Sequence, residues 1–207
     1  MTATRARRTP HGQDSLLEIA VGEFITRGYD ATSMEELAAR LGVTKSAIYH
    51  HVPSKVELLR LALDRTLDAL SAVTEEPAAT SGRAIDRLEH VVRGSVRVLA
   101  AELPYVTLLL RVRGNSDVEQ AALQRRREFD QVVTGLVRAA EEDGDVRPDV
   151  DPAVTSRLLF GTVNSLTEWY RPGGGLSAAA LADAVVATTF EGLRARDRAV
   201  SGRGREC

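Results

Sequence analysis

The sequence predicts an all-α protein: an N-terminal three-helix helix-turn-helix domain followed by a larger C-terminal helical bundle, with about nine helices in total. Apolar residues recur three and four positions apart along nearly the whole chain, whereas the alternation typical of a half-buried strand is hard to find. Capping residues, glycines and prolines separate these periodic segments. The 43% hydrophobic content of 207 residues is enough to bury a sizeable core.

Three short helices are expected before residue 55. The first has an apolar face made of Ile19, Ala20, Phe24 and Ile25. Gly28 follows at the position of its C-terminal cap. In the stretch Thr32-Ser33-Met34-Glu35, the threonine is expected to cap the second helix and the glutamate to reach back, as in a capping box. Gly42 closes that helix, and Thr44 is placed to cap the third.

Longer helices are predicted in the rest of the chain. Ser54 and Glu57 form a second expected capping box at the start of a long helix, which Pro77 stops. The small-residue stretch up to Gly82 is expected to be a connector. Apolar spacing then predicts helices in residues 85–99, 104–113, 117–143 and 151–170, the last of these opened by an Asp-Pro start signal. Ser177 is placed to cap the final helix.

Composition limits both the compartment and the chemistry. A formal net charge of −2 and a pI of about 6.1 exclude a uniformly basic polynucleotide-binding chain, so any DNA-binding surface must be local. The single cysteine, Cys207, allows no intramolecular disulfide and no cysteine-based metal cluster. The arginines near the N-terminus precede polar residues, and no apolar run reaches the length of a membrane span. A cytoplasmic protein without membrane contact is therefore expected.

The segment GVTKSAIYHHVPSK, residues 42–55, contains both lysines of the chain; every other basic residue among the 27 Lys+Arg is an arginine. Two short helices separated by a glycine turn have the length of a helix-turn-helix. Val43 and Ile48 are expected to hold the second helix against the first. The outward side chains of the second helix are then Lys45, Ser46, Tyr49 and His50.

This outer face suits the major groove of DNA. Lys45 matches guanine acceptors, Ser46 matches either base, and Ala47 can touch a thymine methyl group. Phosphates are expected at Tyr49, His51 and Lys55. The amides at the helix starts near residues 32 and 54 are further anion sites. Together, the candidate DNA contacts are Thr32, Ser33, Thr44, Lys45, Ser46, Ala47, Tyr49, His50, His51 and Lys55.

Residues 20–59 resemble the N-terminal domain of the TetR/AcrR family of transcriptional regulators. The resemblance is carried by Phe24, Gly28-Tyr29, Thr32-Ser33-Met34, Leu37-Ala38, Leu41-Gly42-Val43-Thr44-Lys45, Ile48-Tyr49-His50-His51 and Ser54-Lys55. It implies a homodimeric repressor that binds a palindromic double-stranded operator, is released by a small-molecule effector and dimerises through its last two helices. Val52-Pro53 departs from the aromatic-plus-polar pair more frequent in the family.

The expected domains are a disordered basic arm in residues 1–12, the helix-turn-helix domain in residues 13–55, the ligand-binding and dimerisation domain in residues 56–195, and a disordered tail in residues 196–207. The final helix is apolar on more than one side, as expected for a four-helix bundle across a two-fold axis. An effector is expected to tilt the helix after Ser54 and so change the spacing of two recognition helices about one DNA turn, roughly 34 Å, apart.

The C-terminal half holds the candidate effector site. Residues 108–115 and 163–172 are similar to a subgroup of the family that senses CoA thioesters in fatty-acid, phenylacetate or steroid-ring catabolism. Such a ligand needs an apolar slot for its acyl or aryl part and basic residues for its phosphates. The candidate ligand residues are Leu109, Arg111, Arg113, Phe160, Asn164, Trp169 and Arg171. Two alternatives remain: Trp169 packs in the core with the arginines solvated or ion-paired, or the stripe containing Asn164 faces water or a partner helix.

No enzymatic activity, metal site or cofactor is predicted, only an effector such as an acyl-CoA or aryl-acyl-CoA. The chain has no phosphate-binding G-x-x-x-x-G-K loop, H-E-x-x-H, Cys/His metal array or G-x-S-x-G. Arg125-Arg126-Arg127 on a charged helix is expected to be a solvated face. The alternative within the same family is a regulator that senses a different small hydrophobic ligand. The rival classes are a helical-bundle enzyme, for which titratable candidates are few, and a protein-interaction module, whose binding would respond little to salt between about 50 and 200 mM.

Overall fold

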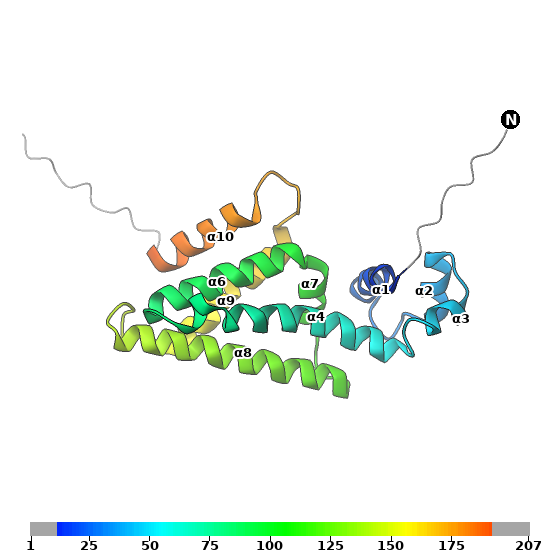
Figure 1. Ribbon diagram of the computed structural model, residues 1–207, viewed down its shortest axis with the longest axis horizontal. Helices are drawn as coiled ribbons and strands as arrows, with labels where there is room; N and C mark the ends of the chain where they lie inside the picture. The colour runs from blue at the N-terminus through cyan, green and yellow to red at the C-terminus, as the bar shows by residue number, and fades with distance from the viewer. Residues whose placement is uncertain (1–11, 192–207) are drawn as a thin grey trace, which may run out of the picture.

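The computed structural model describes residues 12–191; the predicted basic arm, apart from Gly12, and the predicted tail lie outside the described residues. This part of the chain contains ten α-helices, one π-helical turn and no strand, which confirms the all-α class. At one end lie α1 (Gln13–Arg27), α2 (Met34–Leu41) and α3 (Lys45–Tyr49), and α4 (Lys55–Glu75) runs from them into a helical bundle (Figure 1).

The bundle is built on α4 and the helices that follow it. These are α5 (Pro77–Thr80), α6 (Ala84–Ala101), α7 (Leu103–Arg111), α8 (Asp117–Glu142), α9 (Pro152–Trp169), α10 (Ala178–Val186) and the π-helical turn η1 (Ala187–Glu191). In Figure 1, α8 and α10 lie on opposite sides of the bundle, with α6 and α9 between them. Among residues 12–191, no helix is both long enough and apolar enough to cross a membrane. The short α5 corrects the predicted connector, because Pro77 suits a first helical position.

Polar side chains cap the helix starts close to the predicted positions. Thr44, Ser54 and Ser177 each accept the backbone amide three residues later, and the Asp151 carboxylate accepts two amides at the start of α9. The capping box of α2 lies one residue later than predicted: Ser33 is the cap, and the Glu36 carboxylate returns to the Ser33 amide at 2.9 Å. The second predicted box is half present, because the Glu57 carboxylate pairs with an arginine instead.

Two apolar cores fill the described part of the chain, and α7 contributes to both. The first core joins α1–α4, where Leu37 and Ile48 are almost fully buried, to Leu108 on one face of α7. The second core lies among α6, α8, α9 and α10 and takes Val106 from the other face of α7. The N-terminal helices therefore pack on the bundle mainly through α1, which contacts α4 and α7, as well as on each other.

One contact brings the C-terminal part of α4 very close to α6. A methyl group added to Gly94 of α6 would lie 2.3 Å from Cγ1 of Val73, a buried α4 side chain. Real Cβ atoms do not approach other atoms so closely, and a buried β-branched valine has little freedom to move away. Only glycine fits there without a shift of Val73, so at this one position α4 and α6 meet with no side chain of α6 between them.

Candidate DNA-binding surface and effector cavity

The outer face of α3 carries the side chains that the sequence predicted. Ile48 is 1% exposed and belongs to the first core, with Val43 partly buried against the same core. Tyr49 is 44% exposed, unusually open for a large aromatic side chain. The other exposed residues of this segment are Thr44, Lys45, Ser46, His50 and His51. The predicted orientation of α3 is thus confirmed, while contact of these residues with DNA stays a prediction.

The Lys45 ammonium has surface partners within the protein that a DNA contact could replace. Its ammonium forms an ion pair with the Glu35 carboxylate of α2, and its Nζ lies 5.9 Å from the centre of the Tyr49 ring. The hydrogen bond between the two side chains raises the pKa of Lys45 and lowers the pKa of Glu35. Both side chains are about half exposed, 49% and 60%, and such surface pairs are held weakly. The lysine is therefore positioned on α3 yet free to meet a base or phosphate.

Two predicted DNA contacts face the protein and are corrected. Thr32 is 1% exposed; its hydroxyl donates to the Gly28 carbonyl at 2.9 Å and its amide to the Tyr29 carbonyl at 3.2 Å. The Lys55 ammonium donates to the carbonyls of Tyr29 and Thr32, both at 2.9 Å, and lies 4.3 Å from the centre of the Tyr29 ring. Lys55 thus ties the start of α4 to the connection between α1 and α2.

This tie makes Lys55 important for stability. We expect Lys55→Met to lower the free energy of unfolding by about 2 kcal/mol, because two hydrogen bonds from a charged donor to backbone carbonyls are lost. Urea denaturation followed by circular dichroism measures the change. Lys45→Met is the matched control and should alter stability little, since its partner is a surface carboxylate. Equal unfolding midpoints for the Lys55→Met and parent proteins would return Lys55 to a phosphate-binding role.

A mainly apolar cavity of about 50 Å³ lies inside the bundle, where α4, α6, α7, α8 and α9 meet. Of the predicted ligand residues, Leu109, Phe160 and Asn164 line it. The Phe160 ring packs edge-to-face on Phe129 of α8, with ring centres 5.2 Å apart. This cavity is the candidate effector site of the described chain, and it brings together three of the seven predicted ligand residues.

Two charged residues of α8, Arg126 and Asp130, also line the cavity. Partial burial raises the pKa of the Asp130 carboxyl, and the positive charges of Arg126 and Arg157 oppose this rise. Asp130 nevertheless keeps an exposed edge, so this part of the cavity wall reaches the surface. The cavity therefore combines apolar walls with one border where two guanidinium groups lie near a carboxyl group.

The other predicted ligand residues lie outside this cavity, and their contact with an effector stays a prediction. The Arg111 guanidinium donates to the Ile25 carbonyl of α1 at 2.6 Å and joins α7 to α1. Arg113 is exposed in the connection between α7 and α8. Trp169 is 55% exposed at the end of α9, and the Arg171 guanidinium donates to neighbouring backbone carbonyls. Helical spacing alone did not tell which face of each segment turns inward.

Arg126 and Asp130 were missed because the arginine run was expected to be solvated. A signal was nevertheless present in the sequence. Arg126, Phe129, Asp130 and Val133 recur at the spacing of one helical face, so two charged residues share that face with two apolar ones. Charged residues on a stripe that otherwise packs inward indicate a polar border to a core or cavity.

The outer face of α9 exposes large apolar side chains. Val154 is 43% exposed and Leu158 is 66% exposed, and Leu176, just before α10, is 39% exposed. The opposite face of α9 packs into the second core through Leu159 and Val163. An exposed helix-turn-helix, one long connecting helix, a bundle with an internal cavity and an apolar outer face define a DNA-binding regulator with a separate sensing domain.

Comparison with known proteins identifies the family. Residues 16–62 match "Bacterial regulatory proteins, tetR family", and residues 81–193 match "Tetracyclin repressor-like, C-terminal domain". The chain belongs to the TetR family of transcriptional regulators. Its plan is that of a ligand-responsive repressor of this type, and the prediction that it is not an enzyme is confirmed.

Several relatives match most of the chain. The HTH-type transcriptional repressor KstR2 of Rhodococcus jostii (strain RHA1) is 27% identical over 186 residues, covering 86% of this chain and 89% of that protein. The crystal structure of SCO3833, a TetR-family member from Streptomyces coelicolor A3, is 52% identical with a TM-score of 0.83, covering 94% and 96% of the two chains. The crystal structure of AibR in complex with isovaleryl coenzyme A and operator DNA is 25% identical with a TM-score of 0.72, covering 86% and 97%.

Proposed function

We propose that the protein is a homodimeric repressor that binds a palindromic DNA operator through α3 and is released by a CoA thioester. The observation that carries the proposal is the apolar cavity bordered by arginine, in the same chain as an exposed helix-turn-helix. The similarity to AibR, whose structure contains isovaleryl coenzyme A and operator DNA, supports the ligand class. The similarity to the repressor KstR2 supports the direction of regulation.

The size of the cavity supports a release mechanism. At about 50 Å³ it is far smaller than a typical ligand pocket of roughly 300–1,000 Å³. An acyl group of more than a few carbons enters only if the surrounding helices move apart. Filling the cavity and moving α4, two of whose leucines line it, are then the same event. A ligand that prefers the opened state lowers operator affinity by that preference.

The arginines at the cavity border suit the charged part of a CoA thioester. Arg126 lines the cavity, and Arg157 of α9 is close enough to act on the same carboxyl group. Within residues 12–191, neither guanidinium forms an ion pair, so both are available to an anion. Guanidinium groups bind phosphates through paired, charge-assisted hydrogen bonds. An acyl group inside the cavity and phosphates at its border would match this distribution of apolar and charged residues.

A dimer through α9 and α10 accounts for the apolar outer face. Val154 and Leu158 are open to solvent in the single chain, and the exposed face of α10 carries small residues such as Ala180 and Ala184. Small side chains let helices approach closely, and the large ones fill the space between them. Two copies related by a two-fold axis bury both kinds of residue in a four-helix bundle.

Fluorescence anisotropy tests the effector class. The probe is a labelled duplex selected by the protein from a random library, titrated with isovaleryl-CoA and with fatty-acyl, phenylacetyl and steroid-derived CoA thioesters. We expect one thioester class to release the duplex. Arg126→Ala should then weaken the binding of that thioester about ten-fold, because a charge-assisted hydrogen bond is removed.

Arg171→Ala is the matched control, because its guanidinium lies on backbone carbonyls outside the cavity and its loss should leave effector affinity unchanged. Release by no thioester would discard this effector class while keeping the DNA-binding regulator. Equal effects of the two arginine substitutions would discard the arrangement of the ligand.

A further inference from the structure

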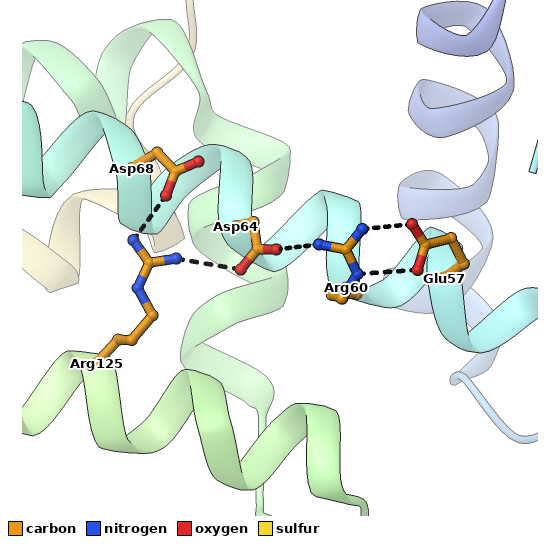
Figure 2. A network of polar contacts seen from close by, with 5 residues as sticks. All are labelled: Glu57, Arg60, Asp64, Asp68 and Arg125. Carbon is orange, nitrogen blue, oxygen red and sulfur yellow. Dashed lines mark hydrogen bonds and ion pairs between the residues drawn. The ribbon is translucent and has the colours of Figure 1, made fainter.

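Five charged side chains form a continuous network on α4 and α8, here called the α4–α8 charge network: Glu57, Arg60, Asp64, Asp68 and Arg125. Figure 2 shows Arg125 reaching from α8 to both aspartates of α4, and Arg60 lying between Asp64 and Glu57. Arg125 is the single member from α8. The network therefore extends along α4 toward the N-terminal helices but is attached to α8 at one residue.

The geometry of the network is well defined. Arg125 Nη1 lies 3.1 Å from Asp64 Oδ1, and its Nη2 lies 2.7 Å from Asp68 Oδ1. The second oxygen of Asp64 accepts Arg60 Nη1 at 2.8 Å. Asp64 is thus shared between an arginine of its own helix and the arginine of α8. With about a third of each side chain exposed, Arg125 and Asp64 are less solvated than an ordinary surface pair.

A hollow lies beside the network, between α4 and the N-terminal half of α8. Its volume is about 280 Å³, and Asp64 and Arg125 are among its walls. The hollow is also lined by Leu63 of α4 and Ala122 of α8, which belong to the first core. The Arg125 ion pairs therefore add a polar link between the two helices next to this apolar contact.

The same part of α8 borders the effector cavity. Arg126 lines the cavity and Arg125 lines the hollow against α4, because successive residues of a helix point about 100° apart. On α4, the cavity residue Leu67 lies between Asp64 and Asp68 in the sequence. A displacement of α8 caused by cavity filling therefore reaches α4 at the network, on the side of the N-terminal helices.

We infer that Arg125 is a positioning residue, which sets the separation of α8 from α4 by holding Asp64 and Asp68. The separation of these helices in turn sets the operator affinity of the protein and the response of that affinity to effector. This inference rests on the proposed function. The inference predicts that Arg125 and Asp64 act as one unit. Loss of either side chain should therefore lower operator affinity as much as loss of both.

A double-mutant cycle on operator affinity tests the inference without knowledge of the effector. The variants are Arg125→Ala, Asp64→Ala and the double substitution, titrated by anisotropy against a duplex selected by the unmodified protein from a random library. Each single substitution should weaken operator binding about five-fold or more. The double variant should bind the operator at least as tightly as the single variant with the lower affinity. Arg127→Ala is the matched control: it removes the same charge nearby, but within residues 12–191 its side chain hydrogen-bonds only to Gln124 of its own helix.

A distance measurement separates positioning from general loss of stability. One spin label per protomer is placed at residue 50 by His50→Cys in a Cys207→Ser background, and the distance between the labels is measured by electron–electron double resonance. The distribution should broaden with Arg125→Ala and stay unchanged with Arg127→Ala, at matched unfolding midpoints.

Additive losses in the cycle, unchanged affinity in Arg125→Ala, or an equal loss in Arg127→Ala would each overturn the inference. These results leave the proposed function intact, because the unmodified protein still binds its duplex. Failure of the unmodified protein to select any duplex would overturn the proposed function and the inference together.

Discussion

Leu158→Arg is expected to convert the dimer into monomers and to weaken operator binding by about 100-fold or more. The Leu158 side chain is 66% exposed on the outer face of α9, where the proposed partner helix packs. Each copy would bring one guanidinium into the interface, so two unpaired charges would lose water there, at several kcal/mol each. A monomer reaches only one half-site of a palindromic operator, which removes most of the affinity.

Size-exclusion chromatography with light scattering measures the mass, and anisotropy measures operator binding. Val132→Arg is the matched control, because Val132 is a 46% exposed apolar residue on α8, away from the proposed interface. It should remain dimeric and bind normally. A Leu158→Arg protein that elutes as a dimer would move the interface away from this face of α9.

Lys45→Ala is expected to weaken operator binding about ten-fold or more. Lys45 stands at the first position of α3 and is exposed beside Tyr49, so its loss removes a contact to a base edge or phosphate. Glu35→Gln should have the opposite effect. In the free protein the Glu35 carboxylate holds the lysine, and its removal frees the ammonium for DNA.

Titrations at several salt concentrations distinguish the two kinds of contact. Loss of a lysine that contacts a phosphate lowers the slope of log affinity against log salt concentration by about one unit, whereas loss of a lysine that contacts a base mainly relaxes the sequence preference at one position. Unchanged affinity of the Lys45→Ala protein on the selected duplex would contradict the proposed docking of α3.

The sequence was sufficient for features set by neighbouring residues. Helix starts at Thr44, Ser54, Asp151 and Ser177 depend on a side-chain oxygen reaching an amide three positions away or less, which spacing reveals. The outward set on α3 followed from the buried position of Ile48. The capping box of α2 was shifted by one residue, because Thr32 and Ser33 carry the same hydroxyl and only the fold determines which one is buried.

Features that depend on distant segments were harder to predict. Lys55 looks like a phosphate ligand until the carbonyls of Tyr29 and Thr32 are seen to surround it. α9 is apolar on two faces, so its sequence could not tell the cavity face with Phe160 from the outer face with Trp169. The cavity itself is made by five helices, and its charged border comes from a helix whose pattern resembles a solvated one.

The close contact between Gly94 and Val73 gives α4 the mechanics of a lever. The fulcrum is at Val73, the load from the cavity arrives at Leu67, and the working end is at Lys55. At 1.5 Å per residue, the short arm measures ~9 Å and the long arm ~27 Å. A rigid α4 therefore triples, at its first residue, a sideways movement imposed beside the cavity. A displacement of ~1 Å becomes ~3 Å, close to the roughly 3.4 Å step between successive base pairs.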